Sequence, residues 1–156
     1  MIKHYHFIGI GGIGMSGIAQ LLIARGDKVS GSDVKESAMT GLLTRQGARI
    51  FTGHSQDNVE GADFVVYSSA IKEDNPEMQE ARRRGIVILK RAQALALLMQ
   101  DKKVICVTGS HGKTTTTSLV SHMLIEADLA PTVAIGGNFK NINTNAAAGA
   151  GDYFVA

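Results

Sequence analysis

Two glycine-rich turns, each between an apolar strand and a helix, constrain the fold of this chain more than any other feature of its sequence. One spans residues 109–115 and follows the apolar run 104–107, and the other spans residues 9–17 and follows the apolar run 4–10. Such a turn directs successive backbone N–H groups towards phosphate oxygens, and the positive end of the following helix adds to the attraction. We therefore expect two α/β units, each with an anion-binding turn.

Strands alternate with helices along the first hundred residues. Apolar runs predict strands at 4–10, 28–32, 49–52, 64–67 and 86–89. Helices are expected after the strands at 4–10, 28–32, 64–67 and 86–89, the first with Ile13, Ile18, Leu21 and Leu22 on one side and the last over 92–99. The helix that starts at Asn75 has a capping side chain, then Pro76, then the acidic Glu77 favoured by the helix dipole. This alternation predicts an α/β fold with a Rossmann-like, doubly wound parallel sheet.

The pattern restarts after the polar residues 100–103, which we take as a domain boundary. The chain then divides into a first domain, 1–99, and the start of a P-loop ATP-binding α/β domain, 100–156. Strands are expected at 104–107, 132–135 and 153–156, with an irregular loop over 136–151. The helix over 114–127 should turn Leu119, Val120, Met123 and Leu124 inwards. Three strands and one helix make a small core, so we expect the N-terminal part of a longer enzyme.

Composition narrows the functional classes. The 156 residues carry a net charge of only +2, which gives no case for nucleic acid as a partner. The N-terminus lacks a signal-peptide core, and no apolar run approaches membrane-spanning length. The single cysteine, Cys106, is expected to be packed in a strand, and it fits a reducing compartment. A cytosolic protein is the expectation.

The turn at 109–115 carries the sharper chemical prediction. Lys113 is expected to contact the terminal phosphates of a nucleotide, and the Thr114 hydroxyl to ligate Mg²⁺. The common pattern G-x-x-x-x-G-K-[ST] would place glycine where Val107 stands. This departure weakens the prediction of a generic NTPase but not the prediction of phosphate binding. The residues expected at this site are Gly109, Ser110, His111, Gly112, Lys113, Thr114 and Thr115.

The first turn is ambiguous in register. Both Gly9-x-Gly11-x-x-Gly14 and Gly12-x-Gly14-x-x-Gly17 satisfy the dinucleotide fingerprint. Asp33 follows about twenty residues later, where that fold places an acid on the ribose. Alone, this pattern indicates NAD binding. Two other interpretations stay open, because the same geometry holds any pyrophosphate and because a tight strand-to-helix turn can have no ligand at all.

Other candidates are weaker. Ser68, Ser69 and Ala70 follow the end of a strand, where ligands bind in open α/β sheets, and an ordinary polar turn is as good an interpretation. His54 is more simply a solvated loop residue than a ligand. His4 and His6 alternate on a strand and are expected to be packing or edge residues.

The motifs together resemble the peptidoglycan Mur ligases. The matching segments are residues 6–17, 30–33, 68–71, 75–77, 109–117, 136–138 and 153–156. The paired glycines of the first turn favour the member of the family that adds alanine. Ser110 stands where the family usually has threonine, and the family's acidic segment that helps hold Mg²⁺ would follow Ala156.

The resemblance implies a function for each turn. The first domain would bind UDP-N-acetylmuramic acid, with the pyrophosphate at residues 11–15 and the uridine near Asp33, His54 and Ser69. The residues implied at this site are Gly11, Gly12, Ile13, Gly14, Met15, Ser32, Asp33, His54, Ser68, Ser69 and Ala70. The second domain would bind ATP and Mg²⁺.

The implied reaction is the ATP-dependent joining of L-alanine to the lactyl carboxylate through an acyl phosphate, in the bacterial cytoplasm. We expect this chain alone to be inactive. Three alternatives stay open: an NAD(P)-dependent oxidoreductase, a sibling ligase that adds a recycled murein tripeptide to the same nucleotide, and a module that only holds the UDP-sugar.

Overall fold

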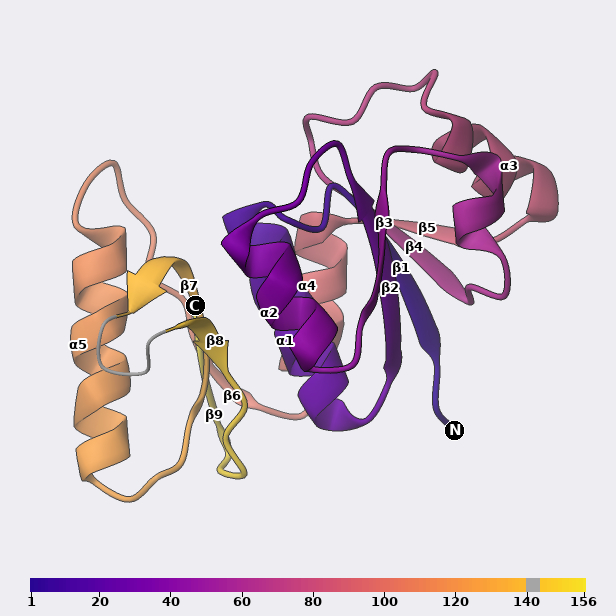
Figure 1. Cartoon of the computed structure of the whole chain (residues 1–156). Helices are drawn as coiled ribbons and strands as arrows, with labels where there is room; N and C mark the ends of the chain where they lie inside the picture. Colours follow the sequence, from indigo (N-terminus) through magenta and orange to yellow (C-terminus); the bar gives the residue numbers. More distant parts are fainter. Residues whose placement is uncertain (140–143) are drawn as a thin grey trace.

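The computed structural model describes residues 1–139 and 144–156, which form two sheets with their helices (Figure 1). In these residues the first sheet has five parallel strands in the order β3-β2-β1-β4-β5. Its strands are β1 (His4–Ile8), β2 (Lys28–Asp33), β3 (Arg49–Thr52), β4 (Phe64–Tyr67) and β5 (Val87–Lys90). Its helices are α1 (Ile13–Arg25), α2 (Ala38–Arg45), α3 (Pro76–Arg84), α4 (Arg91–Met99) and the short 3-10 helix η1 (Gln56–Val59). The predicted doubly wound parallel sheet is confirmed.

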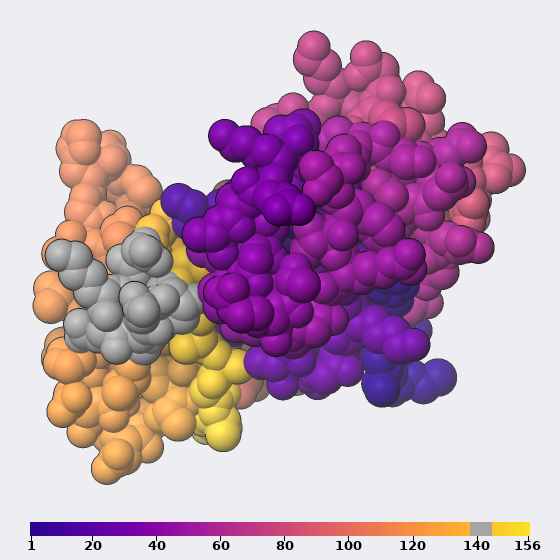
Figure 2. All heavy atoms as spheres, viewed as in Figure 1, coloured from indigo at the N-terminus to yellow at the C-terminus, as the bar shows by residue number. Residues whose placement is uncertain are grey.

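The second sheet follows the order β6-β9-β7-β8 within the described residues. Its elements are β6 (Lys103–Ile105), α5 (Lys113–Glu126), β7 (Thr132–Phe139), β8 (Thr144–Ala147) and β9 (Tyr153–Val155). β6, β9 and β7 run parallel, whereas β8 pairs antiparallel with β7. The space-filling view shows the two parts in contact along one side (Figure 2).

Helices cover both faces of the first sheet. On one face, Tyr5 and Phe7 of β1 pack against apolar side chains of α1, α2 and α4, among them Ile18, Leu22 and Leu43. On the other face, Ile8 packs with Val59 and with Met78 of α3. Because side chains alternate along a strand, His6 lies on the α3 face together with Ile8. That polar position in a buried strand matters for the site below.

Helix α1 is buried on both sides. Ile18 and Leu22 belong to the core of the first sheet, whereas Leu21 packs with Ala146 and Phe154 of the second sheet. Figure 1 accordingly places α1 and α4 between the two sheets. The prediction of a single apolar side was therefore incomplete, and Ile13 is 53% exposed at the start of the helix.

Three expectations for the second part were wrong. Residues 136–151 are not an irregular loop throughout, because they include the end of β7 and all of β8; residues 140–143 lie outside the described part. In α5, Leu119 and Met123 are 59% and 69% exposed and Val120 and Leu124 are only half-buried, while Thr117 and Ser121 are buried. Small hydroxyl side chains let that face of the helix approach the sheet. The buried Ser121 hydroxyl has a hydrogen-bond partner within the helix, because it donates to Thr117 O. Cys106 is exposed rather than packed, because it follows the end of β6.

Element boundaries otherwise agree with the sequence within two residues. β1 ends at Ile8, two residues early, because Gly9 takes a positive φ of 81° that turns the chain away from the sheet. Asn75 caps α3, with its Oδ1 accepting from the N–H groups of Glu77 and Met78 at 2.9 and 3.3 Å. Among the described residues, every helix is too short or too polar to cross a membrane.

Candidate functional site

A cleft of ≈ 450 Å³ opens at the carboxyl ends of β1, β2 and β4. In the strand order 3-2-1-4-5 the chain reverses its direction of winding between β1 and β4, and open α/β sheets bind ligands at this switch point. The lining residues are Gly9, Gly11, Gly12, Asp33, Val34, Lys35, Ser37, His54, Ser68, Ala70 and Ile71. Six of the residues expected from sequence therefore meet in one cleft: Gly11, Gly12, Asp33, His54, Ser68 and Ala70.

The glycine turn is held to β2 by backbone hydrogen bonds. Ser32 O accepts from the N–H groups of Gly9 and Ile10 at 2.8 and 3.0 Å. Gly12 is the N-cap of α1 and has no side chain with which to cap it. The first N–H groups of a helix have no partner within the helix, so an uncapped start leaves donors for an anion.

Asp33 anchors the turn. Its Oδ2 accepts from Gly11 N at 2.8 Å, and its Oδ1 accepts from Val34 N at 2.8 Å. A Cβ atom on Gly11 would lie 2.8 Å from Asp33 Oδ2, so glycine is needed for this approach. The acid thus orders the turn at the edge of the cleft and keeps further lone pairs for a ligand.

Some expected residues lie elsewhere. Ser32 and Met15 are 0% and 2% exposed, so their side chains support the cleft from within the fold instead of lining it. Ser69 is exposed but does not line the cleft, whereas Lys35, which sequence reasoning missed, does. Its position two residues after Asp33, at the end of β2, was the available signal.

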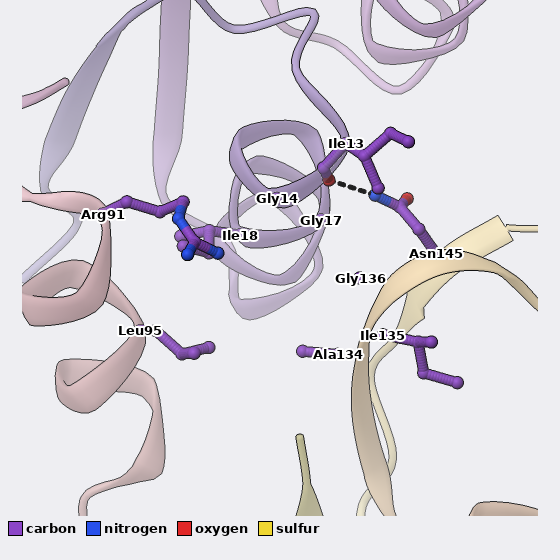
Figure 3. A pocket seen from close by; sticks show the side chains of 10 residues that line it. All are labelled: Ile13, Gly14, Gly17, Ile18, Arg91, Leu95, Ala134, Ile135, Gly136 and Asn145. Atoms are coloured by element: carbon purple, nitrogen blue, oxygen red, sulfur yellow. Dashed lines mark hydrogen bonds between the residues drawn. The ribbon is translucent and has the colours of Figure 1, made fainter. Parts of the chain in front are cut away.

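Ile13 and Gly14 line a second, smaller cavity of ≈ 50 Å³ at the junction of α1, α4 and β7 (Figure 3). The guanidinium of Arg91 lies against Gly14, where an added Cβ would sit 2.6 Å from one of its nitrogens. A cation therefore stands beside the first turn of α1, close to the end of the helix that attracts anions.

Asn145 of β8 fastens the first turns of α1 to the second sheet. It is 1% exposed; its amide nitrogen donates to Ile13 O and, at 3.2 Å, to Ser16 Oγ. Its oxygen accepts from Gln20 Nε2 at 2.7 Å. The contact to Ile13 is drawn in Figure 3. The helix start that carries the glycine turn is thus positioned by both sheets.

A buried carboxylate lies behind the cleft. Glu77 is 0% exposed; its Oε2 accepts from Ser32 Oγ at 2.6 Å, and its Oε1 from Asn58 Nδ2 at 2.5 Å. Burial acts to raise the pKa of Glu77, but its contacts with His6, Ser32 and Asn58 outweigh burial and hold the pKa below its ordinary value. His6 Nε2 lies 3.7 Å from Oε2, which is too far for a hydrogen bond. The hydrogen bonds to the Glu77 carboxylate therefore come from Ser32 and Asn58.

His54 links that carboxylate to the cleft. Its Nδ1 lies 3.0 Å from Ser32 Oγ and 3.3 Å from Glu77 Oε2. The ring is half-buried, and it lines the cleft. The solvated loop residue that we expected from sequence is instead held by two partners.

The second glycine-rich turn, residues 109–115, joins β6 to α5 and is exposed throughout. Gly112 caps α5 with a positive φ of 77° and no side chain, so the helix start is again uncapped. The Lys113 ammonium group bends back to its own turn, where it donates to Gly109 O and, at 3.4 Å, to Ser110 O. A lysine over a helix N-terminus suits a phosphate chain.

Thr114 lies against β7. A Cβ atom on Gly137 would come within 3.2 Å of Thr114 Cγ2, so the bare backbone of β7 approaches the start of α5. Among the described residues, no group of three or more His, Cys, Asp or Glu side chains is arranged to hold a metal ion. The Thr114 hydroxyl fits Mg²⁺ as one ligand beside the phosphate oxygens of a nucleotide.

Comparison with known proteins agrees with this architecture. The model of the Mur ligase family, catalytic domain, matches residues 4–103, and that of the Mur ligase middle domain matches residues 107–153. The chain is 56% identical to the UDP-N-acetylmuramate–L-alanine ligase of Aquifex aeolicus and 54% identical to that of Sorangium cellulosum. Each alignment covers 99% of this chain but 34% and 33% of the relative, so the chain spans about a third of their length.

Solved structures agree as well. The UDP-N-acetylmuramate-alanine ligase MurC from Thermotoga maritima matches with a TM-score of 0.89 and 38% identity, over 99% of this chain and 37% of that one. The UDP-N-acetylmuramate:L-alanyl-gamma-D-glutamyl-meso-diaminopimelate ligase from Neisseria meningitides matches with a TM-score of 0.92 and 30% identity, over 99% and 52%. The chain belongs to the Mur ligase family.

Proposed function

We propose that this chain is the part of an ATP-dependent ligase that holds two phosphorylated substrates, UDP-N-acetylmuramic acid and ATP, for the addition of L-alanine. The observation that carries the proposal is the pair of uncapped helix starts, at Gly12 and Gly112, each following a parallel strand. An uncapped N-terminus with a glycine turn is a site for an anion, and two of them in one chain call for two phosphate-bearing ligands.

The cleft at β1, β2 and β4 is assigned to the UDP-sugar. Its pyrophosphate would lie on the turn at 11–15, and its uridine near Asp33 and His54. Lys35 lines the same cleft and would add a positive charge. Arg91, which lies against Gly14, is a further cation beside that turn.

The turn at 109–115 is assigned to ATP, with Mg²⁺ on the Thr114 hydroxyl. In the proposed reaction the γ-phosphoryl group passes to the lactyl carboxylate and ADP leaves; the amine of L-alanine then attacks the acyl carbon, and phosphate leaves as the amide forms. Phosphorylation converts a carboxylate, whose leaving group would be oxide, into a usable acyl donor. Lys113 would offset charge on the transferring group, which is an electrostatic role.

The domain division follows from the same proposal. Residues 1–99 would form the UDP-sugar domain, and residues 100–156 the N-terminal part of the ATP-binding domain. The matches of the two family models, to 4–103 and 107–153, support this division.

A second candidate is a ligase that adds a tripeptide to the same nucleotide. The similarity to the Neisseria enzyme, a ligase of UDP-N-acetylmuramate and L-alanyl-gamma-D-glutamyl-meso-diaminopimelate, favours this candidate. That similarity is 30% identity, however, against 50–56% identity to curated alanine ligases. An oxidoreductase would use the first turn and leave residues 109–115 without a function, so it is the weaker hypothesis.

Calorimetric titrations of the 156-residue chain test the proposal. We expect UDP-N-acetylmuramic acid to bind and NADH not to bind; NADH binding alone would refute the assignment. Lys113→Ala should weaken ATP·Mg²⁺ binding about tenfold to a hundredfold, since hydrogen bonds to charged groups are worth about 1.5–3 kcal/mol, while UDP-sugar affinity stays unchanged. Lys28→Ala removes one exposed positive charge elsewhere and is the control. If Lys113→Ala weakened both ligands equally, the two-site assignment would be wrong.

A further inference from the structure

Glu77 is a buried acid that the proposed reaction does not use. Its side chain lies behind the cleft, on the α3 face of the first sheet, with no exposure to solvent. We propose that Glu77 is a positioning residue, which fixes the ring of His54 in the tautomer that presents a hydrogen-bond acceptor to the UDP-sugar. The identity of that ligand rests on the proposed function; the tautomer does not.

The hydrogen-bond inventory determines the proton positions. An ionised carboxylate only accepts, so the single hydroxyl proton of Ser32 is used in the 2.6 Å bond to Glu77 Oε2. Ser32 Oγ can then only accept from His54 Nδ1, 3.0 Å away. The 3.3 Å contact between His54 Nδ1 and Glu77 Oε2 has the same requirement. Both contacts therefore place a proton on Nδ1 of His54.

The remaining ring nitrogen is the one available to a ligand. Within the described residues, no protein group forms a hydrogen bond with His54 Nε2, and the ring lines the cleft. In the neutral Nδ1–H tautomer, Nε2 carries a lone pair. The ligand group that it recognises is therefore an N–H or O–H donor, the kind that a nucleoside offers through its ribose hydroxyls or the imide of its base.

The other groups near Glu77 do not compete for this role. His6 Nε2 lies 3.7 Å from Oε2, and its Nδ1 bonds instead to Ser30 Oγ at 2.9 Å. Asn58 donates to the other carboxylate oxygen, and the same amide nitrogen also donates to Gly53 O at 3.3 Å. The amide of Asn58 is thereby held with its nitrogen towards Glu77.

Glu77→Gln should reverse the tautomer with almost no change in shape. Because Asn58 presents a donor, the new amide keeps its oxygen on that side and turns its nitrogen to Ser32. Ser32 Oγ must then accept from the amide, and its own proton becomes available to His54 Nδ1. The ring is expected to move its proton to Nε2 and to present a donor where the ligand needs an acceptor.

Nitrogen-15 spectra of the histidine side chains test this directly, without any ligand. Signals of His54 are assigned with the His54→Ala variant. We expect the Nδ1–H tautomer in the wild type and the Nε2–H tautomer in Glu77→Gln. Glu80→Gln, on the same helix but paired with Arg83 and Arg84, is the matched control and should leave His54 unchanged. An Nε2–H tautomer in the wild type, or no change in Glu77→Gln, overturns the proposal.

Calorimetry with UDP-N-acetylmuramic acid then separates positioning from mere structural support. Glu77→Gln should weaken binding about tenfold or more, the cost of one mismatched buried polar contact. In the His54→Ala background the same substitution should have no further effect, because Glu77 acts through His54. An equal loss in both backgrounds would refute the positioning role. If the folded wild type failed to bind the nucleotide while the spectra were as expected, the proposed function would fail and the tautomer assignment would stand.

Discussion

Asn145→Ala should destabilise the whole chain, because this one side chain fastens the start of α1 to the second sheet. The substitution removes the contacts to Ile13 O, Ser16 Oγ and Gln20 Nε2. A buried hydrogen bond contributes about 1 kcal/mol net, so three of them give about 3 kcal/mol. For a chain of this size, each kcal/mol lowers the melting temperature by about 2–4 °C, so a fall of about 6–12 °C is expected.

Urea unfolding followed by circular dichroism measures that free energy. The control is Gln79→Ala, which removes an amide from an exposed position of α3 and should change the free energy of unfolding by less than about 0.5 kcal/mol. Gln20→Ala combined with Asn145→Ala should cost less than the sum of the two single changes, because the two side chains bond to each other. A loss for Asn145→Ala no larger than that of the control would show that these contacts between α1 and the second sheet do not stabilise the fold in solution.

Two further predictions concern α3. Asn75→Ala removes the cap that accepts from Glu77 N and Met78 N, and it should lower the free energy of unfolding by about 1 kcal/mol in the same urea assay. The pKa of Glu80 is lowered from 4.5 to about 2 because Arg83 and Arg84 donate to its carboxylate. Its stabilising effect is then complete above about pH 4.5 and lost as the pH falls towards 2. The melting temperatures of wild type and Glu80→Gln should accordingly converge over that interval, and a constant difference would contradict the assignment.

The architecture of the first sheet could be predicted from local signals. Gly26, Gly47 and Gly85 mark the ends of helices or the turns just after them, and apolar runs mark each strand within two residues. The burial of α5 could not be predicted in the same way. An amphipathic pattern places the largest apolar side chains inwards, but this helix packs through Thr117 and Ser121, and only the surrounding sheet decides which face it covers.

In the candidate site, too, residues with a local sequence signal could be predicted, and residues brought together only by the fold could not. Asp33 and the glycine turns were predicted because their spacing along the chain carries the signal. Glu77 was assigned only to the helix dipole, because its partner Ser32 lies 45 positions earlier. Asn145 is 132 positions from Ile13, and no local pattern relates them. The alternation of His4 and His6 along their strand could be seen in the sequence, but their partners Lys28 and Ser30 on β2 and the helix that covers that face are known only from the fold.

Because α1 belongs to two cores at once, the chain is less divisible than its two family matches imply. Cutting it after Met99 would expose Leu21 and the neighbouring side of the helix to water. It would also remove the Asn145 oxygen that accepts a hydrogen bond from Gln20 Nε2. A rotation of one sheet against the other would likewise have to move α1, the helix that follows the first glycine turn, or break its packing against one of the sheets. Because α1 packs against both sheets, its contacts help to fix where the first anion-binding turn lies relative to the second sheet.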